Sequence, residues 1–205
     1  MPALVWRFAR PMRVVASTAL GGGIGERHWI LNAQVASDYA RLDPAQHLSA
    51  LARLAGCAGP GVGFLTAARV QRWTSGTDEG VDAYATVGLA RPVRAAAQPS
   101  TAEPAAQPTV GTINVVVFTP VALSDSALVN AVVTATEAKT QALLDCDVGG
   151  TGTASDAVCV VTEFDGAPEA FCGPRSSTGA ALARAVHRAV ADGARAWVSE
   201  HGHVP

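Results

Sequence analysis

Residues 128–161, LVNAVVTATEAKTQALLDCDVGGTGTASDAVCVV, decide the fold of the second half of this chain. Apolar residues recur about one helical turn apart in the first part of the stretch, which predicts a long helix beginning at Ser124 or Asp125. The residues with this spacing are Leu128, Val132, Ala135 and Ala142. A turn rich in glycine and hydroxyl groups follows at residues 149–155, and the apolar run at residues 157–164 predicts a strand.

Outward from this stretch, the chain alternates between strand and helix patterns. Residues 112–118 form the clearest predicted strand, and a final helix is predicted to begin at Ser177 or Thr178. Asp43 and Pro44 predict the start of a shorter helix that ends at Gly56. Apolar segments with β-branched or aromatic residues predict further strands at residues 14–17, 29–35, 62–66 and 81–87, with a glycine turn at 21–25 and a polar turn at 74–79.

These patterns predict a mixed α/β fold with a β-rich first half. The 205 residues, 49% of them hydrophobic, are enough for one sizeable core, so we expect a single domain over residues 1–205. Helices should pack on the faces of one large sheet or of two stacked sheets, and the pattern does not choose between these. Residues 94–109 lack bulky apolar side chains and are predicted to form a flexible loop rich in Ala, Pro and Gln.

Charge and cysteine content exclude several classes of function. The chain has 15 Lys and Arg against 17 Asp and Glu, which gives no indication of nucleic-acid binding. No apolar run approaches the ~20 residues of a membrane span, and the N-terminal residues lack the ordered regions of a signal peptide. The four cysteines form no C-x-x-C pair and the histidines lack metal-ligand spacing, so we expect a reduced cytoplasmic protein without a bound metal.

The block TATEAK at residues 134–139 holds candidate groups for proton transfer. Glu137 is its only carboxylate, and desolvation in an apolar setting would suit it to act as general acid or base. Thr134 lies three positions away and shares its helix face, whereas Lys139 lies two positions away, ~200° around the axis. On a regular helix, Glu137 and Lys139 therefore cannot both face one pocket. The alternative for Glu137 is an exposed helix carboxylate, and for Lys139 a solvated or ion-paired lysine.

A second group of candidates lies in the glycine turn and on the strands. Backbone N–H groups of such turns can hold an oxyanion, and Asp156 could orient a water or a hydroxyl, or else bond to its own turn. Polar residues inside apolar strands need hydrogen bonds, which either the core or a substrate can supply. These candidates are Thr151, Thr153, Ser155 and Asp156 in the turn, and Asn32, Thr66, Thr86 and Asn114 on the strands.

The motif TATEAK followed by TGTASDAV at residues 151–158 resembles the signature of the adenosylcobinamide amidohydrolases, which act in corrinoid salvage. Further similar stretches are GGGIGERHWILNAQV (21–35), GVGFLTAA (61–68), ATVGLARP (85–92) and GTINVVVF (111–118). The resemblance implies hydrolysis of the amide that joins the aminopropanol arm to the corrin ring of adenosylcobinamide. It implies no further cofactor, because the substrate carries the cobalt.

With that resemblance, the expected catalytic residues are Glu137, Thr134, Asp156, Lys139 and Thr153. The expected substrate-binding residues are Asn32, Thr66, Thr86, Asn114, Thr136, Thr151 and Ser155. The pocket should form where the glycine turn meets the helix face of Thr134 and Glu137, with Asp156 at its edge. Two other functions stay open: a corrinoid-binding protein without catalysis, and an amidase with another substrate and a threonine nucleophile such as Thr153 or Thr134. A homo-oligomer is compatible with the sequence.

Overall fold

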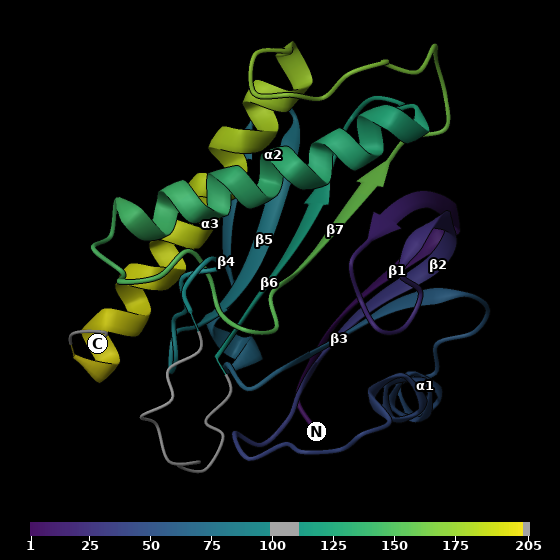
Figure 1. The fold of residues 1–205 in the computed structure, drawn as a ribbon. Coiled ribbons are helices and arrows are strands. Elements are labelled where there is room, and N and C mark those ends of the chain that lie inside the picture. The colour runs from purple at the N-terminus through teal and green to yellow at the C-terminus, as the bar shows by residue number, and fades with distance from the viewer. Residues whose placement is uncertain (99–110, 203–205) are drawn as a thin grey trace.

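The computed structural model describes residues 1–98 and 111–202. Within these residues one sheet of seven strands has the order β3-β2-β1-β7-β6-β5-β4 (Figure 1). The strands are β1 (Ala3–Ala16), β2 (Gly23–Gln34), β3 (Gly61–Thr66), β4 (Thr74–Asp78), β5 (Val81–Gly88), β6 (Thr112–Phe118) and β7 (Ala157–Thr162). The helices are α1 (Pro44–Leu54), α2 (Asp125–Leu144) and α3 (Ser177–His201), with a 3-10 turn, η1 (Val70–Arg72). The predicted α/β class is confirmed.

The sheet folds back on itself, and a break in β1 allows it. Arg7 pairs with Trp29 but Met12 pairs with Arg27, so β1 carries extra residues between its two paired halves. Pro11 lies in this irregular segment, where its missing N–H costs no ladder bond. The first half of β1 thereby reaches across the opposite end of the sheet, where Trp6 contacts Tyr84 with ring centroids 5.7 Å apart. The structure thus has one sheet with two facing halves, and not two separate stacked sheets.

Strands β6 and β7 and helix α2 form a parallel β-α-β unit. Asn114 and Ala157 are register partners at the amino ends of β6 and β7. Ser124 caps α2 by accepting a hydrogen bond from the Ala127 backbone N–H at 3.2 Å, as expected for a serine at this position. α2 and α3 cover one face of the sheet, and many of the residues buried between them and the strands are alanines. Small side chains let the two helices pack close to the strands.

Helix α1 covers the outer face of β2 and β3 (Figure 1). Pro44 occupies its first turn, as the sequence predicts. Asp43 makes no side-chain capping bond and instead accepts two hydrogen bonds from Arg41, at 2.8 and 2.7 Å. This ion pair lies directly before the first residue of α1.

Several strand boundaries differ from the predictions. β2 begins at Gly23, inside the predicted glycine turn at residues 21–25. β1 begins at Ala3 rather than at residue 14. The sequence did not predict its first half because Arg7 and Arg10 interrupt the apolar residues there. Residues 74–79 were predicted as a turn, and this was wrong for β4. This edge strand is polar but contains Gly76, and a side chain there would meet the Ala185 carbonyl oxygen of α3. Contact with α3, rather than strand propensity, explains β4.

The predicted flexible loop at residues 94–109 lies mostly outside the described residues. Its described part is tied down, because Arg94 Nε donates to the Gly149 carbonyl at 3.1 Å and the Ala95 N–H donates to Thr151 Oγ1 at 3.0 Å. This end of the segment is therefore attached to the glycine turn at residues 149–155.

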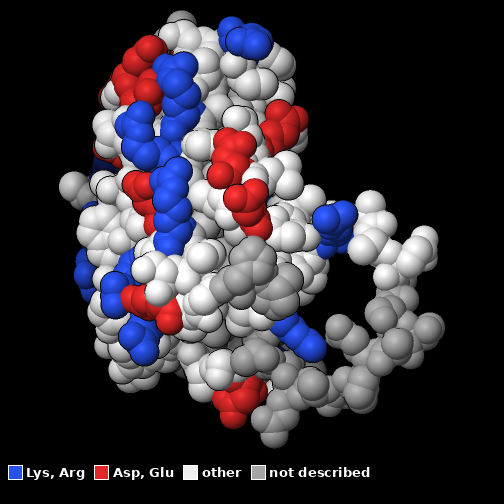
Figure 2. All heavy atoms as spheres, turned by 90° about the vertical axis from the view of Figure 1, so that its left-hand side faces the viewer, with Lys and Arg blue, Asp and Glu red and all other residues white. Residues whose placement is uncertain are grey.

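The surface beside α3 is charged but internally paired. Figure 2 shows a band of basic side chains with acidic side chains next to it. Arg184 pairs with Asp78 and Glu79, and Arg195 pairs with Asp192. These arginines thus have carboxylate partners within the same molecule. No helix within the described ranges combines the length and the apolar character that a membrane span requires.

Candidate functional site

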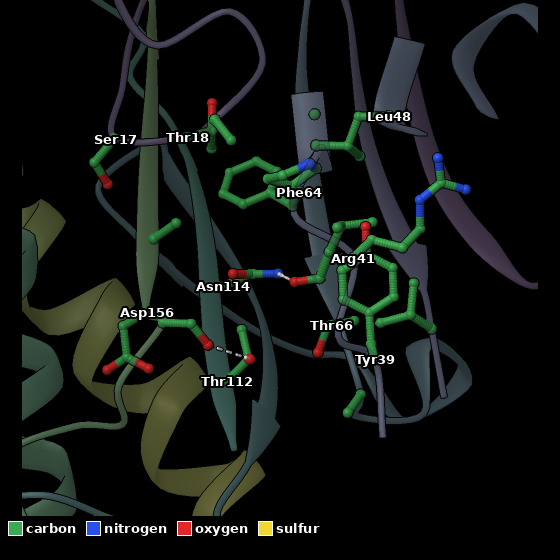
Figure 3. A pocket seen from close by; sticks show the side chains of 18 of the residues that line it. Ser17, Thr18, Tyr39, Arg41, Leu48, Phe64, Thr66, Thr112, Asn114 and Asp156 are labelled. Atoms are coloured by element: carbon green, nitrogen blue, oxygen red, sulfur yellow. Dashed lines mark hydrogen bonds between the residues drawn. The ribbon is translucent and has the colours of Figure 1, made fainter. Parts of the chain in front are cut away.

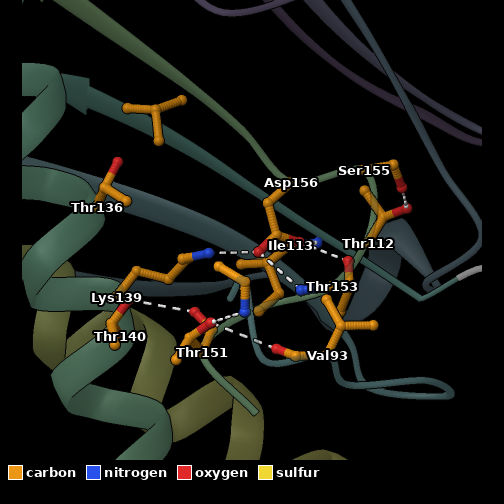
Figure 4. Close-up of polar contacts among 12 residues, drawn as sticks. Val93, Thr112, Ile113, Thr136, Lys139, Thr140, Thr151, Thr153, Ser155 and Asp156 are labelled. Carbon is orange, nitrogen blue, oxygen red and sulfur yellow. Dashed lines mark hydrogen bonds and ion pairs between the residues drawn. The ribbon is translucent and has the colours of Figure 1, made fainter. Parts of the chain in front are cut away.

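Asp156 is the centre of the polar cluster just before β7 (Figure 4). Its Oδ1 accepts hydrogen bonds from the Ile113 N–H at 2.9 Å and from the Thr153 hydroxyl at 2.5 Å. Its Oδ2 accepts from the Thr153 N–H at 3.0 Å and from the Lys139 ammonium group. Four donors therefore surround one carboxylate, and they fix its position between β6, α2 and the glycine turn.

Lys139 reaches this carboxylate from the buried face of α2. Its side chain is 8% exposed and that of Asp156 is 12% exposed, so the ion pair is largely shielded from water. Gly152 makes room for it, because a Cβ at this position would meet both Asp156 Oδ2 and Lys139 Nζ. Lys139 and Asp156 are thus a buried pair whose close contact requires a glycine.

The glycine turn is held from its other side by the segment after β5. The N–H of Val93 donates to the Gly152 carbonyl and the N–H of Thr151 donates to the Val93 carbonyl, both at 2.8 Å. Thr140 of α2 also donates to the Thr151 carbonyl, at 3.1 Å. Thr151 therefore anchors the turn to its neighbours, and its hydroxyl already has partners in Val93 and Ala95.

A cleft of about 390 Å³ opens on the other side of Asp156, between the two halves of the folded sheet (Figure 3). Its polar lining comes from three regions: the amino ends of β6 and β7, the carboxyl end of β3, and the segments that follow β1 and β2. Of the described residues that line it, Asp156 is the only one with a carboxylate. The polar residues are Ser17, Thr18, Tyr39, Arg41, Thr66, Thr112, Asn114, Ser155 and Asp156.

Asn114 lies in the cleft wall and is 2% exposed. Its Nδ2 donates both to the Leu65 carbonyl at 3.0 Å and to Asn32 Oδ1 at 3.1 Å. Asn32 Nδ2 in turn donates to the Thr86 hydroxyl at 2.9 Å. Asn114, Asn32 and Thr86 thus form a hydrogen-bond chain that joins the two halves of the sheet, with only Asn114 in the cleft.

Two hydroxyl groups lie together at the same wall. Thr112 Oγ1 and Ser155 Oγ are 2.7 Å apart, and Ser155 Oγ is 3.2 Å from the Gly111 carbonyl oxygen. No carboxylate or imidazole of the described residues bonds to Ser155. These hydroxyls can therefore bind a water or a polar substrate group, but Ser155 lacks an adjacent base.

Tyr39 and Arg41 form the opposite rim of the cleft (Figure 3). The Tyr39 hydroxyl lies 3.0 Å from His47 Nδ1, its ring stacks on the His47 ring, and burial raises the pKa of the phenol. Arg41 is held by Asp43. Sequence reasoning missed both residues, because neither lies in a strand or a recognisable motif; the adjacent helix start at Pro44 is the only local signal.

The two buried cysteines, Cys159 and Cys172, are not candidate nucleophiles at neutral pH. Burial raises the pKa of the Cys172 thiol to about 11 and that of the Cys159 thiol well above its ordinary value. A thiol attacks as its thiolate, so a raised pKa makes it inert. Within the described ranges, no group of three or more His, Cys, Asp and Glu side chains is arranged to hold a metal.

A family model described as adenosylcobinamide amidohydrolase matches residues 1–202. The chain belongs to this family. The matched region includes the folded sheet, the Lys139–Asp156 pair and every residue that lines the cleft. The resemblance seen in the TATEAK and TGTASDAV motifs is therefore confirmed over nearly the whole chain.

Curated relatives carry the same name. The adenosylcobinamide amidohydrolase of Methanosarcina mazei is 32% identical over 162 residues, 79% of this chain and 74% of that protein. The one of Halobacterium salinarum is 39% identical over 108 residues, 52% of this chain and 46% of that protein. A crystal structure of the PH0078 protein from Pyrococcus horikoshii OT3 covers 90% of this chain and 72% of its own, with 13% identity and a TM-score of 0.44.

In this amidohydrolase, six of the predicted site residues lie in or beside the cleft. Thr66, Asn114, Ser155 and Asp156 line it, and Lys139 and Thr153 bind Asp156 from behind. Asn32 and Thr86 support Asn114, and Thr151 anchors the turn, without lining the cleft.

The expected meeting of Glu137 and Thr134 with Asp156 is absent from this amidohydrolase structure. Glu137 and Thr136 are exposed on the outer side of α2, and no hydrogen bond or ion pair joins Glu137 to the described residues. Thr134 is buried and donates to the Cys172 carbonyl at 2.9 Å. The helical spacing of Glu137 and Lys139 does separate them, as predicted, but it is Lys139 that faces inward.

Proposed function

We propose that this chain hydrolyses the amide bond between the corrin ring and the aminopropanol arm of adenosylcobinamide, which releases aminopropanol and adenosylcobyric acid. The family match over residues 1–202 carries this proposal. The cleft supports it, because it places one carboxylate, several hydroxyls and an amide side chain around a space large enough for the arm.

The size of the cleft indicates how such a substrate would bind. Pockets for drug-sized ligands measure about 300–1,000 Å³, and a corrin with its adenosyl ligand is much larger than such a ligand. The cleft of about 390 Å³ therefore suits the arm and its amide, while the ring lies outside against the rim. The rim residue Tyr39 and the fully exposed Leu42 offer apolar surface for the ring.

Asp156 is the group to which we assign proton transfer. It takes a proton from an attacking water as the water oxygen bonds to the amide carbon, and it gives this proton to the nitrogen as the C–N bond breaks. The products are then a carboxylic acid and a free amine, with one water consumed. Lys139 and Thr153 act as positioning residues, because their hydrogen bonds to Asp156 fix the orientation of its carboxylate.

The Thr153 hydroxyl can serve both protonation states of Asp156. It lies 2.5 Å from Asp156 Oδ1 and 2.8 Å from the Gly111 carbonyl oxygen, and it has one proton for these two acceptors. With a carboxylate, Thr153 donates to Asp156. With a carboxylic acid, Asp156 donates to Thr153, which donates to Gly111. A proton can thus come and go without leaving a buried polar group unpaired.

Thr153→Val should lower kcat about 10- to 100-fold, since it keeps the shape of the side chain but removes the hydroxyl that serves both states. Thr153→Ser, the matched control, should stay within about threefold of wild type. The measurements are kcat and KM for release of aminopropanol: kcat should fall for Val and not for Ser, with KM little changed in either variant. Equal kcat values for both variants would show that Thr153 does not assist Asp156.

Glu137→Gln should change turnover by less than about threefold, because an exposed carboxylate away from the cleft makes no proton transfer there. This expectation reverses the role predicted for Glu137 from sequence. Release of aminopropanol, followed by mass spectrometry, is the measurement, with Gln141→Glu on the same helix as a surface-charge control. A loss of 100-fold or more in Glu137→Gln would restore Glu137 to the mechanism and displace Asp156.

Turnover of adenosylcobinamide by the purified protein tests the function itself. Mass spectrometry should detect adenosylcobyric acid and aminopropanol in equal amounts. A shift in the corrinoid spectrum without release of aminopropanol would indicate a binding protein and contradict the proposed hydrolysis.

A further inference from the structure

The hydroxyl group of Thr66 has a proton that no described residue accepts. Its Oγ1 accepts the Ala68 N–H at 3.0 Å, which fixes the oxygen at the cleft wall. Each of the other hydroxyl groups that line the cleft lies within hydrogen-bonding distance of an acceptor. These other groups belong to Ser17, Thr18, Tyr39, Thr112 and Ser155. Thr66 is only 1% exposed, so its proton is available to a group that enters the cleft.

Asn114 has the complementary property, an acceptor without a donor. The Leu65 carbonyl can only accept a hydrogen bond, so the group that faces it must be Nδ2, which donates at 3.0 Å. The second Nδ2 proton goes to Asn32 Oδ1 at 3.1 Å. The end that remains is the carboxamide oxygen, and no donor among the described residues contacts it. Because Asn114 lines the cleft, this oxygen can accept a hydrogen bond from a ligand there.

The two free groups lie on the same face of the folded sheet. Thr66 follows Phe64 by two residues and Asn114 precedes Val116 by two, and side chains two apart on a strand share a face. Phe64 and Val116 belong to one buried cluster between the two halves of the sheet. The Leu65 carbonyl that binds Asn114 also belongs to the peptide group directly before Thr66. A free donor and a free acceptor are therefore neighbours in the cleft wall (Figure 3).

A hydroxyl group matches such a pair, because it accepts one hydrogen bond and donates another. The aminopropanol arm of adenosylcobinamide carries a hydroxyl group beyond its amide, on the side away from the corrin ring. With the ring at the rim and the arm in the cleft, this hydroxyl group is the polar part of the arm that reaches deepest. Thr66 and Asn114 are almost fully buried, as expected of groups at the inner end of the cleft.

We propose that Thr66 and Asn114 bind the hydroxyl group of the aminopropanol arm, with Thr66 donating to its oxygen and Asn114 accepting its proton. The cleft thereby selects substrates with a hydroxylated arm. The inference rests on the proposed hydrolase function, but neither contact involves Asp156. An arm without the hydroxyl group would leave the Thr66 proton and the Asn114 oxygen unpaired, which is costly at buried positions.

The test compares adenosylcobinamide with two analogues that have hydrogen or fluorine in place of the hydroxyl group of the arm. The scissile amide is the same in all of them. Fluorine is close to a hydroxyl group in size but has no proton to donate to Asn114. Wild type should prefer the hydroxylated arm at least about 30-fold in kcat/KM over each analogue. A fluorinated arm that reacts as well as the natural arm would overturn the contact with Asn114.

Thr66→Val should lower the preference for the hydroxylated arm over the deoxy arm about tenfold, because it removes the free donor. Loss of the Ala68 bond affects both substrates in this variant and cancels in their ratio. Thr66→Ser, the matched control, keeps the hydroxyl group and should stay within about threefold of the wild-type preference.

Thr18→Val is a second control at the cleft wall. It removes a hydroxyl group whose proton already goes to the Leu20 carbonyl at 2.8 Å, so the preference should again stay within about threefold of wild type. An unchanged preference in Thr66→Val, or an equal fall in Thr18→Val, would overturn the contact with Thr66.

The wild-type comparison decides the matter even if Thr66→Val fails to fold. A preference below about 30-fold for the hydroxylated arm contradicts the proposal and leaves the hydrolase function standing. If wild type releases none of the three arms, the hydrolase function fails and the inference falls with it, a result distinct from cleavage without selectivity.

Discussion

Asp156→Asn should lower the turnover of adenosylcobinamide by about 10²- to 10⁴-fold, the usual contribution of a general acid–base group. It should also lower the free energy of unfolding by about 3–5 kcal/mol, because the Lys139 ammonium group loses its charged partner in a largely buried position. Urea unfolding and product release measure the two effects separately. Turnover within tenfold of wild type would remove Asp156 from the mechanism.

A second substitution separates stability from chemistry. Asp156→Asn combined with Lys139→Met should recover part of the lost free energy of unfolding, since it removes the unpaired ammonium group. Turnover should not recover, because the carboxylate is still missing. If the double variant regained activity, the loss in Asp156→Asn would be due to unfolding rather than to proton transfer.

Gly152→Ala should destabilise the protein by about 3 kcal/mol and lower turnover together with stability. The added methyl group would meet Asp156 Oδ2 and Lys139 Nζ, and the four donors around Asp156 leave its carboxylate nowhere to move. The melting temperature at neutral pH measures the change, and adenosylcobinamide turnover follows it.

Gly88→Ala is the matched control for this substitution. At Gly88, the nearest atoms to an added Cβ would be Ala68 Cβ at 3.2 Å and the Thr112 carbonyl oxygen at 3.4 Å, so neighbours need to shift only slightly. We expect a loss of about 1 kcal/mol and near-normal turnover. Equal losses of stability in the two variants would show that contact with the Lys139–Asp156 pair is not the reason why a glycine is needed at position 152.

Local patterns predicted most of the secondary structure, and long-range contacts account for the failures. The strand at Thr112–Phe118 and the helix that begins after Ser124 follow from apolar spacing and capping, which act over a few residues. β4 escapes such reasoning because contact with α3 at Gly76 stabilises it. The sheet folds back at the irregularity near Pro11 in β1. The resulting contact, between Trp6 and Tyr84, joins residues far apart in the sequence, so local patterns do not predict it.

For the proposed site, the sequence predicted that the glycine turn and Asp156 meet Glu137, their neighbour in the motif, whereas Asp156 lines the cleft and Glu137 does not. The apolar spacing of α2 contained a signal that favoured Lys139: it lies four positions after Ala135 and three before Ala142, both fully buried. These intervals place Lys139 on the inward face. Glu137 falls outside that spacing and is exposed.

The cleft itself could not be predicted from one stretch of sequence. Its walls come from segments far apart in the chain, including Tyr39 and Thr66 on one side and Asn114 and Asp156 on the other. Only the folding of the sheet brings them together. The cleft also lies at the amino ends of the parallel strands β6 and β7, whereas ligands of open α/β sheets usually bind at the carboxyl ends.

The place of β1 in the sheet has a consequence for how this chain is made. Arg13 to Ala16 pair with Cys159 to Thr162 of β7, so β1 leaves the ribosome long before β7 and has an unpaired edge until β7 follows. Contacts between such distant residues form slowly, and an open edge invites association with other nascent chains. The cleft is completed by the same late pairing, because Asp156 immediately precedes β7. A nascent chain that stops short of β7 therefore lacks the proposed site.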